Sequence, residues 1–212
     1  MTSKLHHERI ARGPEAMSKL SRCRILLCGA GALGSNLAVN LVRMGVKKLT
    51  IVDKDRVEEH NISTQIYGLE DIGALKAEMV RNMIFRDVGE EITSLAKEVN
   101  QQNAAKLLKG FDLIIDTFDN SASRRLVKET CISLDAQCLH AGVNDQYGEV
   151  IWNARYRVPS DEGVDVCDYP LSRTLVLLVV SIASEVAVRY ILSGEQQNYS
   201  VTTGDFSINR EY

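Results

Sequence analysis

Short apolar runs alternate with segments of helical periodicity over the first two thirds of the chain. Buried strands are predicted at 23–29 (CRILLCG), 48–53 (KLTIVD), 91–99 (EITSLAKEV) and 111–119 (FDLIIDTFD). Helices are predicted at 32–44, 74–85, 102–110 and 121–134. Such alternation favours a mainly parallel sheet with helices on both faces, where ligands bind beyond the carboxyl ends of the strands. Asp53, Asp116 and Asp119 fall at such ends.

The pattern changes after residue 134. Strands are predicted around 137–142 and 149–158, then a polar loop over 158–170, a long apolar helix over 171–192 and a strand-like tail over 198–208. The last third is therefore expected to be antiparallel or mixed. Together these elements predict one domain over 1–212 with a helical arm over 1–20. Its fold class is α/β, with a Rossmann-like, doubly wound, mostly parallel sheet and antiparallel C-terminal strands.

Composition and charge indicate a globular chain without a general affinity for polyanions. Apolar residues make up 45% and charged residues 25%, and the net charge is -3. A nucleic-acid partner is therefore not expected. Residues 1–17 contain scattered charges and no apolar core, which predicts a cytosolic protein. The most apolar run, 175–183, is shorter than the roughly 20 residues of a membrane span, so a buried helix and no membrane association are predicted.

The cysteines do not form a recognisable framework. Five are present, and none belongs to a C-x-x-C pair: Cys23, Cys28, Cys131, Cys138 and Cys167. This argues against both a disulfide scaffold and a four-cysteine zinc site, so free thiols and no zinc are expected.

The stretch GAGALG carries the first candidate chemistry. Gly29, Gly31 and Gly34 satisfy G-x-G-x-x-G between a predicted strand and a predicted helix, and with Ala32 and Leu33 they form a predicted phosphate loop. Asp53, about 20 positions on, is placed to bind ribose hydroxyls. Such a loop suits NAD and ATP equally, so the motif does not choose between them.

Polar residues beyond the second strand and beyond the strand at 111–119 favour ATP. They are Asn61, Gln65, Lys76, Asp119, Asn120 and Arg124. A triphosphate carries more charge than backbone amides can offset, and Lys76 at a helix start adds a positive charge near the phosphates. The carboxylate of Asp119 is of the type that holds magnesium on phosphates.

The ordered set GAGALGS, IVDKDRVEEHN-xxx-Q, GALKAE and D-x-x-DN resembles the adenylating enzymes of the ThiF, MoeB, HesA and ubiquitin-activating type, as a short zinc-free member. The resemblance covers nearly the whole chain. It implies that 29–34 cradles phosphates, that Asp53 holds the ribose, and that Asp55 binds ribose or magnesium or orients the loop. By the same resemblance, Asn61, Gln65 and Lys76 contact the triphosphate, Asn120 and Arg124 lie among the nucleotide-binding residues, and Asp119 binds Mg²⁺.

The resemblance also implies partners and a reaction. The arm HHERI places Arg9 as a finger that reaches into the site of a second copy, which implies a homodimer. The implied reaction is attack of a carboxylate on the α-phosphate of ATP, which gives an acyl adenylate and pyrophosphate. The usual substrate is the C-terminal glycine of a ubiquitin-like or sulfur-carrier protein. Cys167 lies in the loop where some relatives carry an acceptor thiol.

Some residues depart from the pattern of these enzymes. Thr64 stands where an arginine is usual, which removes one nucleotide contact, and the arm has His6, His7 and Ile10 in place of its usual residues. Carboxylates at Asp165 and Asp168 flank Cys167 and disfavour its thiolate.

Three other functions fit parts of the sequence. A zinc-free branch of the same enzymes activates a tRNA-linked carboxylate and closes it to a ring, but the acidic net charge opposes tRNA binding. A nucleotide-binding regulatory module without turnover is favoured by Thr64 and the altered arm. An NAD-dependent oxidoreductase lacks a recognisable catalytic set in this chain.

Overall fold

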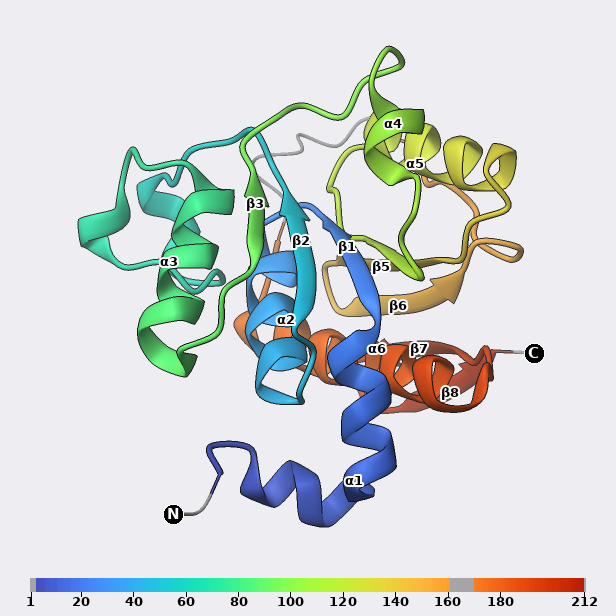
Figure 1. Cartoon of the computed structure of the whole chain (residues 1–212). Helices are drawn as coiled ribbons and strands as arrows, with labels where there is room; N and C mark the ends of the chain where they lie inside the picture. The colour runs from blue at the N-terminus through green and yellow to red at the C-terminus, as the bar shows by residue number, and fades with distance from the viewer. Residues whose placement is uncertain (1–2, 161–169, 212) are drawn as a thin grey trace.

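A computed structural model describes residues 3–160 and 170–211 of the chain. One eight-stranded sheet runs through it in the order β3-β2-β1-β4-β5-β6-β7-β8 (Figure 1). The parallel strands are β1 (Arg24–Cys28), β2 (Lys48–Val52), β3 (Thr93–Leu95), β4 (Leu113–Asp116) and β5 (Cys138–Asn144). The connecting helices are α2 (Ala32–Arg43), α3 (Lys76–Val88), α4 (Ala104–Leu108) and α5 (Ser121–Ser133). The predicted doubly wound α/β fold is confirmed.

The end of the sheet is antiparallel, also as predicted. It contains β6 (Tyr147–Trp152), β7 (Asn198–Thr202) and β8 (Ile208–Glu211), and α6 (Arg173–Ser193) precedes β7. Three predicted boundaries were wrong. The tail is a hairpin of two strands, the strand predicted at 91–99 is formed by 93–95 alone, and β6 stops at Trp152 because the amides of Arg155 and Tyr156 turn back to its carbonyl oxygen.

Helices cover both faces of the parallel part. On one face α2, α3 and α6 pack on a cluster that includes Ile25, Leu27 and Ile115. On the other face α4 and α5 pack on Leu26 and Ile114. Successive residues of β1 and β4 thus point to opposite faces, and all except the exposed Arg24 are buried, which explains why these strands read as nearly continuous apolar runs.

The apolar run near the C-terminus is a core helix, as predicted. In length and composition α6 would be able to cross a membrane, so the shortness of the run 175–183 was not a sufficient argument. Half of its most apolar window is buried inside the protein. Val179 and Ala183 lie in the main cluster, and Gly148 of β6 lets the helix approach the sheet closely. Packing, rather than length, assigns α6 to the core.

The N-terminal arm forms the helix α1 (His6–Arg22), which is kinked. Gly13, with a φ of 81°, breaks the helical conformation just before Pro14. Of the residues of α1 only Leu20 is fully buried, and the guanidinium of Arg12 holds the arm to α6 through Glu185 at 2.9 Å. Figure 1 shows α1 beyond the amino ends of the central strands.

Cysteines in the described part of the chain behave as predicted. Cys28, Cys131 and Cys138 are buried, Cys23 is partly buried, and all four are free thiols. Cys167 lies outside the described residues.

The contact between α6 and β6 gives a stability prediction. A Cβ added to Gly148 would lie 2.2 Å from Cγ2 of Val179, so Gly148→Ala forces the helix away from the sheet. We expect the free energy of unfolding in urea to fall by about 1–3 kcal/mol. Gly68→Ala is the control, since its Cβ meets only Asp71 at 3.9 Å, and its effect stays within about 0.5 kcal/mol. Equal effects of the two substitutions would show that this packing is not tight.

Candidate functional site

The predicted site residues gather where the order of the sheet reverses. The chain passes from β1 outward to β2 and β3, then returns to place β4 on the other side of β1. The loops that follow β1 and β4 therefore leave toward opposite faces of the sheet, and the crevice between such loops is the usual ligand position in open α/β sheets. There the amide of Thr117 donates to the carbonyl oxygen of Cys28 at 2.9 Å, which joins the two strand ends.

The glycine loop is built for a close approach of backbone to backbone. Gly29 has a φ of 99°, and a Cβ on Gly34 would lie 2.0 Å from the carbonyl oxygen of Gly29. Gly31 is the N-cap of α2, has no neighbour within 4 Å of its Cβ position, and supplies no side-chain cap. The first amides of α2 are thus left without a side-chain acceptor, which fits binding of a phosphate.

Asp53 ties this loop to the end of β2. Its Oδ2 accepts from the amide of Ala30 at 2.6 Å, and its Oδ1 accepts from the amide of Asp55 at 2.7 Å. Burial raises the pKa of the Asp53 carboxyl, although the two backbone hydrogen bonds oppose that rise. The residue is only 7% exposed, so its first role in the structure is to shape the loop.

Lys76 lies at the start of α3, as expected, and is held near the glycine loop. Its amide donates to the carbonyl oxygen of Asp55 at 2.9 Å. The hydroxyl of Tyr67 donates to the carbonyl oxygen of Ala30 at 2.7 Å and lies 3.3 Å from that of Lys76, which bridges the two segments. The Lys76 charge is close enough to oppose the rise in the pKa of Asp53. Among the described residues its ammonium has no hydrogen bond or ion pair.

The loop over 61–65 has a structural role in its own right. The Asn61 side chain caps a 3₁₀ turn by accepting from the amide of Glu58 at 2.9 Å. Thr64 is 7% exposed, and Nδ2 of Asn36 donates to its carbonyl oxygen at 2.9 Å. Oε1 of Gln65 is buried and has no hydrogen-bond partner in the described part of the chain. Gln65 therefore retains an acceptor for a ligand, whereas Thr64 is packed inside.

A cavity lies beside this loop rather than at the glycine loop. It measures about 560 Å³ and lies between α2, the loop, α3 and the start of α6. Its wall includes Val39, Ile62, Gln65, Met83 and Arg173. Neither 29–34 nor Asp53 lines it, so the cavity is not the predicted phosphate site.

The turn after β4 carries the other predicted nucleotide ligands. Asp119 is exposed, and Nδ2 of Asn120 donates to its Oδ1 at 3.3 Å. Asn120 caps α5 by accepting from the amide of Ser123 at 2.9 Å. Arg124 is 6% exposed and donates to the Tyr156 hydroxyl at 2.8 Å and to the carbonyl oxygen of Ala141 at 3.0 Å. Asp119 thus faces solvent, whereas Arg124 is engaged inside the protein.

A buried polar cluster next to this turn was not predicted. His140 is fully buried between Asp116 and Asn153, and the Tyr156 ring stacks on it at 3.8 Å. Burial lowers the pKa of Arg124, but the Asp116 carboxylate raises it and the net shift is upward. The sequence predicts Asn153 and Tyr156 as part of the strand at 149–158, whereas the structure places both after the end of β6. A histidine in an otherwise apolar strand was the only signal of the cluster in the sequence.

One predicted catalytic residue, Arg9, lies away from this site, and another, Cys167, lies outside the described residues. Arg9 is exposed on α1, and α1 leads into the amino end of β1, opposite the glycine loop. Within one chain it is therefore not brought to the site. Cys167 falls in the undescribed stretch 161–169. Asp55 lies at the site and is exposed.

The donors present fit a magnesium ion held jointly with phosphates. The described residues contain no group of three or more His, Cys, Asp or Glu side chains that could hold a metal by themselves. Asp119 offers one exposed carboxylate beside the turn. Mg²⁺ is usually held by one or two carboxylates, water and substrate phosphates, so a single carboxylate is enough.

Comparison with known proteins agrees with this geometry. The model of the ThiF family matches residues 5–204, nearly the whole chain. The chain belongs to the ThiF family. This ThiF chain is 29% identical over 140 residues to the sulfur carrier protein adenylyltransferase of Thermus thermophilus, covering 65% of the chain and 52% of that protein. It is 32% identical over 142 residues to the sulfur carrier protein ThiS adenylyltransferase of Bacillus subtilis, covering 64% and 42%.

Other relatives and solved structures extend the comparison. SUMO-activating enzyme subunit 2 of Dictyostelium discoideum is 29% identical over 154 residues, covering 71% of the ThiF chain and 23% of that protein. The chain thus spans about half or less of the length of these three relatives. The structure of E. coli MccB with ATP superposes with a TM-score of 0.83 at 13% identity, covering 100% of the chain and 71% of MccB, a likeness of fold.

The glycine loop of this ThiF chain gives a second prediction. Gly34→Ala places a Cβ against the carbonyl oxygen of Gly29, which cannot move aside as a flexible side chain would. We expect a loss of about 1–3 kcal/mol in the free energy of unfolding. Gly31→Ala has open space around its Cβ and a φ of -77°, so we expect a loss below about 1 kcal/mol. Urea unfolding of both variants measures the difference, and the reverse order would contradict the loop geometry.

Proposed function

We propose that the chain is an ATP-dependent adenylyltransferase that activates the C-terminal carboxylate of a ubiquitin-like or sulfur-carrier protein. The observation that carries the proposal is the convergence of two helix starts. The uncapped start of α2 and the start of α3 are joined through Asp53 and Asp55, and the second supplies Lys76 with an ammonium that makes no ion pair in the described structure. Membership of the ThiF family and relatives named as adenylyltransferases support it.

This arrangement favours a triphosphate over a dinucleotide. Helix amides alone are sufficient to bind the pyrophosphate of NAD, whereas a triphosphate needs additional positive charge. Lys76 supplies that charge. Its ammonium stays available because both carboxylate oxygens of Asp53 accept from backbone amides. The exposed carboxylate of Asp119 completes a set with no evident use in hydride transfer.

The proposed reaction needs positioning rather than a general base. A carboxylate oxygen of the carrier bonds to the α-phosphorus of ATP, the bond from that phosphorus to the bridging oxygen breaks, and pyrophosphate leaves with the electron pair. Negative charge grows on the phosphate oxygens during this exchange, so a fixed ammonium and fixed helix amides lower the barrier. Lys76 would hold the phosphates through its ammonium, and 29–34 through backbone amides.

Asp119 would hold Mg²⁺ on the phosphates, where the ion neutralises charge as pyrophosphate forms. Asn120 restrains the Asp119 carboxylate from one side, so the metal ligand is oriented before ATP arrives. Asn61 and Asn120 would then act through the loops that they cap, in addition to any direct contact with the nucleotide.

The remaining parts of the proposal concern partners and location. A homodimer would let Arg9 of one copy enter the site of the other, since α1 does not bring it to its own. Cys167 would take over the activated carrier as a thioester. The protein would act in the cytoplasm. A nucleotide-binding module without turnover is the second candidate, because Thr64 is packed inside and no residue at that position reaches the nucleotide.

Calorimetric titration with Mg·ATP and with NAD tests the site. We expect Mg·ATP to bind and NAD not to bind. Lys76→Ala and Asp119→Ala each remove a charged contact and should weaken Mg·ATP by about 10–100-fold. Binding of NAD, or an Mg·ATP affinity that is unchanged in both variants, would refute the proposal.

Matched controls come from charges away from the site. Lys48 is exposed at the amino end of β2, and Asp205 is exposed between β7 and β8. Lys48→Ala and Asp205→Ala should leave Mg·ATP affinity within about twofold of wild type. Exchange of labelled pyrophosphate into ATP, measured with carrier proteins that end in glycine, then separates an enzyme from a module that only binds nucleotide.

A further inference from the structure

The turn that presents Asp119 is anchored from inside the protein. It begins at the end of β4, where Oδ1 of Asp116 accepts from the amide of Phe118 at 3.1 Å. It ends where Asn120 caps α5. Asp119 lies between these two anchors, so its exposed carboxylate is positioned by backbone that other side chains hold in place.

Asp116 is in turn held by His140. The two residues pair in register on neighbouring strands β4 and β5, and Nδ1 of His140 lies 2.8 Å from Oδ2 of Asp116. Both side chains are fully buried. A buried carboxylate oxygen that lost this hydrogen bond would turn toward other donors. The interaction with His140 therefore fixes which oxygen faces Phe118.

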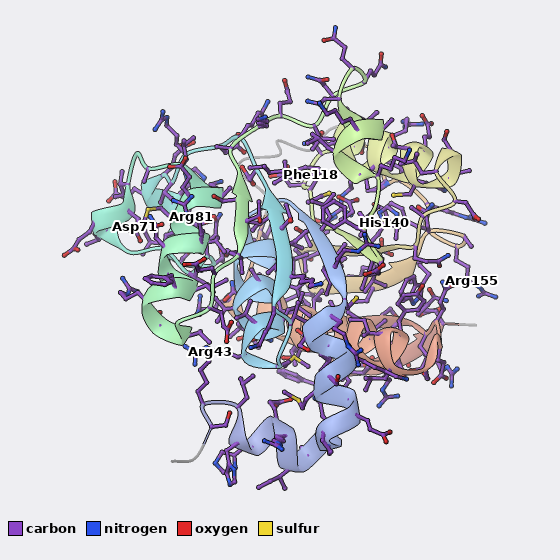
Figure 2. All side chains as sticks on the ribbon, in the orientation of Figure 1. Arg43, Asp71, Arg81, Phe118, His140 and Arg155 are labelled. Carbon is purple, nitrogen blue, oxygen red and sulfur yellow. The ribbon has the colours of Figure 1, made fainter. Side chains whose placement is uncertain are left out.

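The His140 ring is itself fixed from three sides. Nε2 lies 2.7 Å from Oδ1 of Asn153, and Nδ2 of Asn153 donates to the carbonyl oxygen of Lys128 at 3.3 Å. This second contact orients the Asn153 amide with its oxygen toward the ring. The Tyr156 ring stacks on the imidazole at 3.8 Å and 7°. Figure 2 labels two residues of this chain of contacts, His140 and Phe118.

We propose that His140 is a positioning residue of the Mg·ATP site: through Asp116 it fixes the Phe118 amide, and thereby the turn that presents Asp119. The proposal rests on the proposed adenylation function for its ligand. The path runs Asn153, His140, Asp116, Phe118, and it includes none of the residues assigned above to the nucleotide or to Mg²⁺. Loss of the path should therefore change how Mg²⁺ is held without removing any ligand.

Two substitutions of His140 distinguish the contact made by Nδ1 from the contact made by Nε2. An asparagine amide reaches the place of Nδ1 of histidine, whereas a glutamine amide reaches the place of Nε2. His140→Asn thus keeps a donor for Asp116, and His140→Gln loses it, while both lose the stacked ring. The pair is matched for the loss of the aromatic contact and differs in the link to Phe118.

Hydrogen exchange at the Phe118 amide in the metal-free protein and Mg·ATP titration are the two measurements. In His140→Gln, hydrogen exchange at the Phe118 amide should become about tenfold faster, and the affinity for Mg·ATP should fall about tenfold. Each change corresponds to the loss of one charge-assisted hydrogen bond. Binding of ATP without Mg²⁺ should change by less than about threefold in that variant, since Asp119 acts through the metal. His140→Asn should stay within about threefold of wild type in both measurements.

A control removes core volume on the same face of the sheet without removing any hydrogen bond of the path. Val127 on α5 is fully buried, and Val127→Ala should lower stability while Phe118 exchange relative to global unfolding and Mg²⁺ dependence stay as in wild type. Equal behaviour of His140→Gln and His140→Asn, or a Val127→Ala effect on Mg²⁺ dependence equal to that of His140→Gln, would overturn the proposal.

Failure of the adenylation proposal would be seen separately. If wild type binds no Mg·ATP, that function is wrong, while Phe118 exchange in the His140 variants still supports or overturns the positioning of the turn. If His140→Gln does not fold, Asn153→Ala loosens the ring from its other side. We then expect about threefold faster exchange at Phe118, and unchanged exchange would overturn the path.

Discussion

One buried carboxylate holds together the segments on which the site depends. Asp53 accepts from the glycine loop through Ala30 and from the loop after β2 through Asp55, whose carbonyl in turn receives the first amide of α3. Hydrogen bonds to a charged group contribute roughly 1.5–3 kcal/mol each. They offset the cost of burying the charge, which is visible in the raised pKa of Asp53. Two helix starts are thereby set at fixed positions around one crevice.

The same crevice is held on its other side by uncharged contacts. The hydroxyl of Thr117 donates to the carbonyl oxygen of Cys28 at 2.8 Å and packs against Gly29, so that neither strand end can shift alone. Asp53 and Thr117 thus hold the glycine loop from both neighbouring strands. A ligand at this loop would meet a surface that needs little rearrangement, which reduces the entropic cost of binding.

The parts of the site that follow one another along the chain were predictable from the sequence, and those that depend on packing across the sheet were not. The strand ends at Asp53 and Asp116 follow from alternating apolar runs, and the helix start at Lys76 follows from a local pattern. The contact of Asn36 with Thr64 joins residues 28 positions apart, and nothing local reveals it. Likewise, Asn153 meets His140 only because β5 and β6 pair antiparallel and the chain turns after Trp152.

The kink in α1 divides the N-terminal arm into two halves. Gly13 sets the angle between them; Leu20, the only fully buried side chain of α1, lies in the second half, and Arg12 ties the first half to α6 through Glu185. A change of direction at Gly13 would swing Arg9 through a wide arc and break surface contacts such as the Arg12–Glu185 ion pair, while leaving the apolar core and the glycine loop intact. Selection can then adjust the reach of the arm without changing the glycine loop.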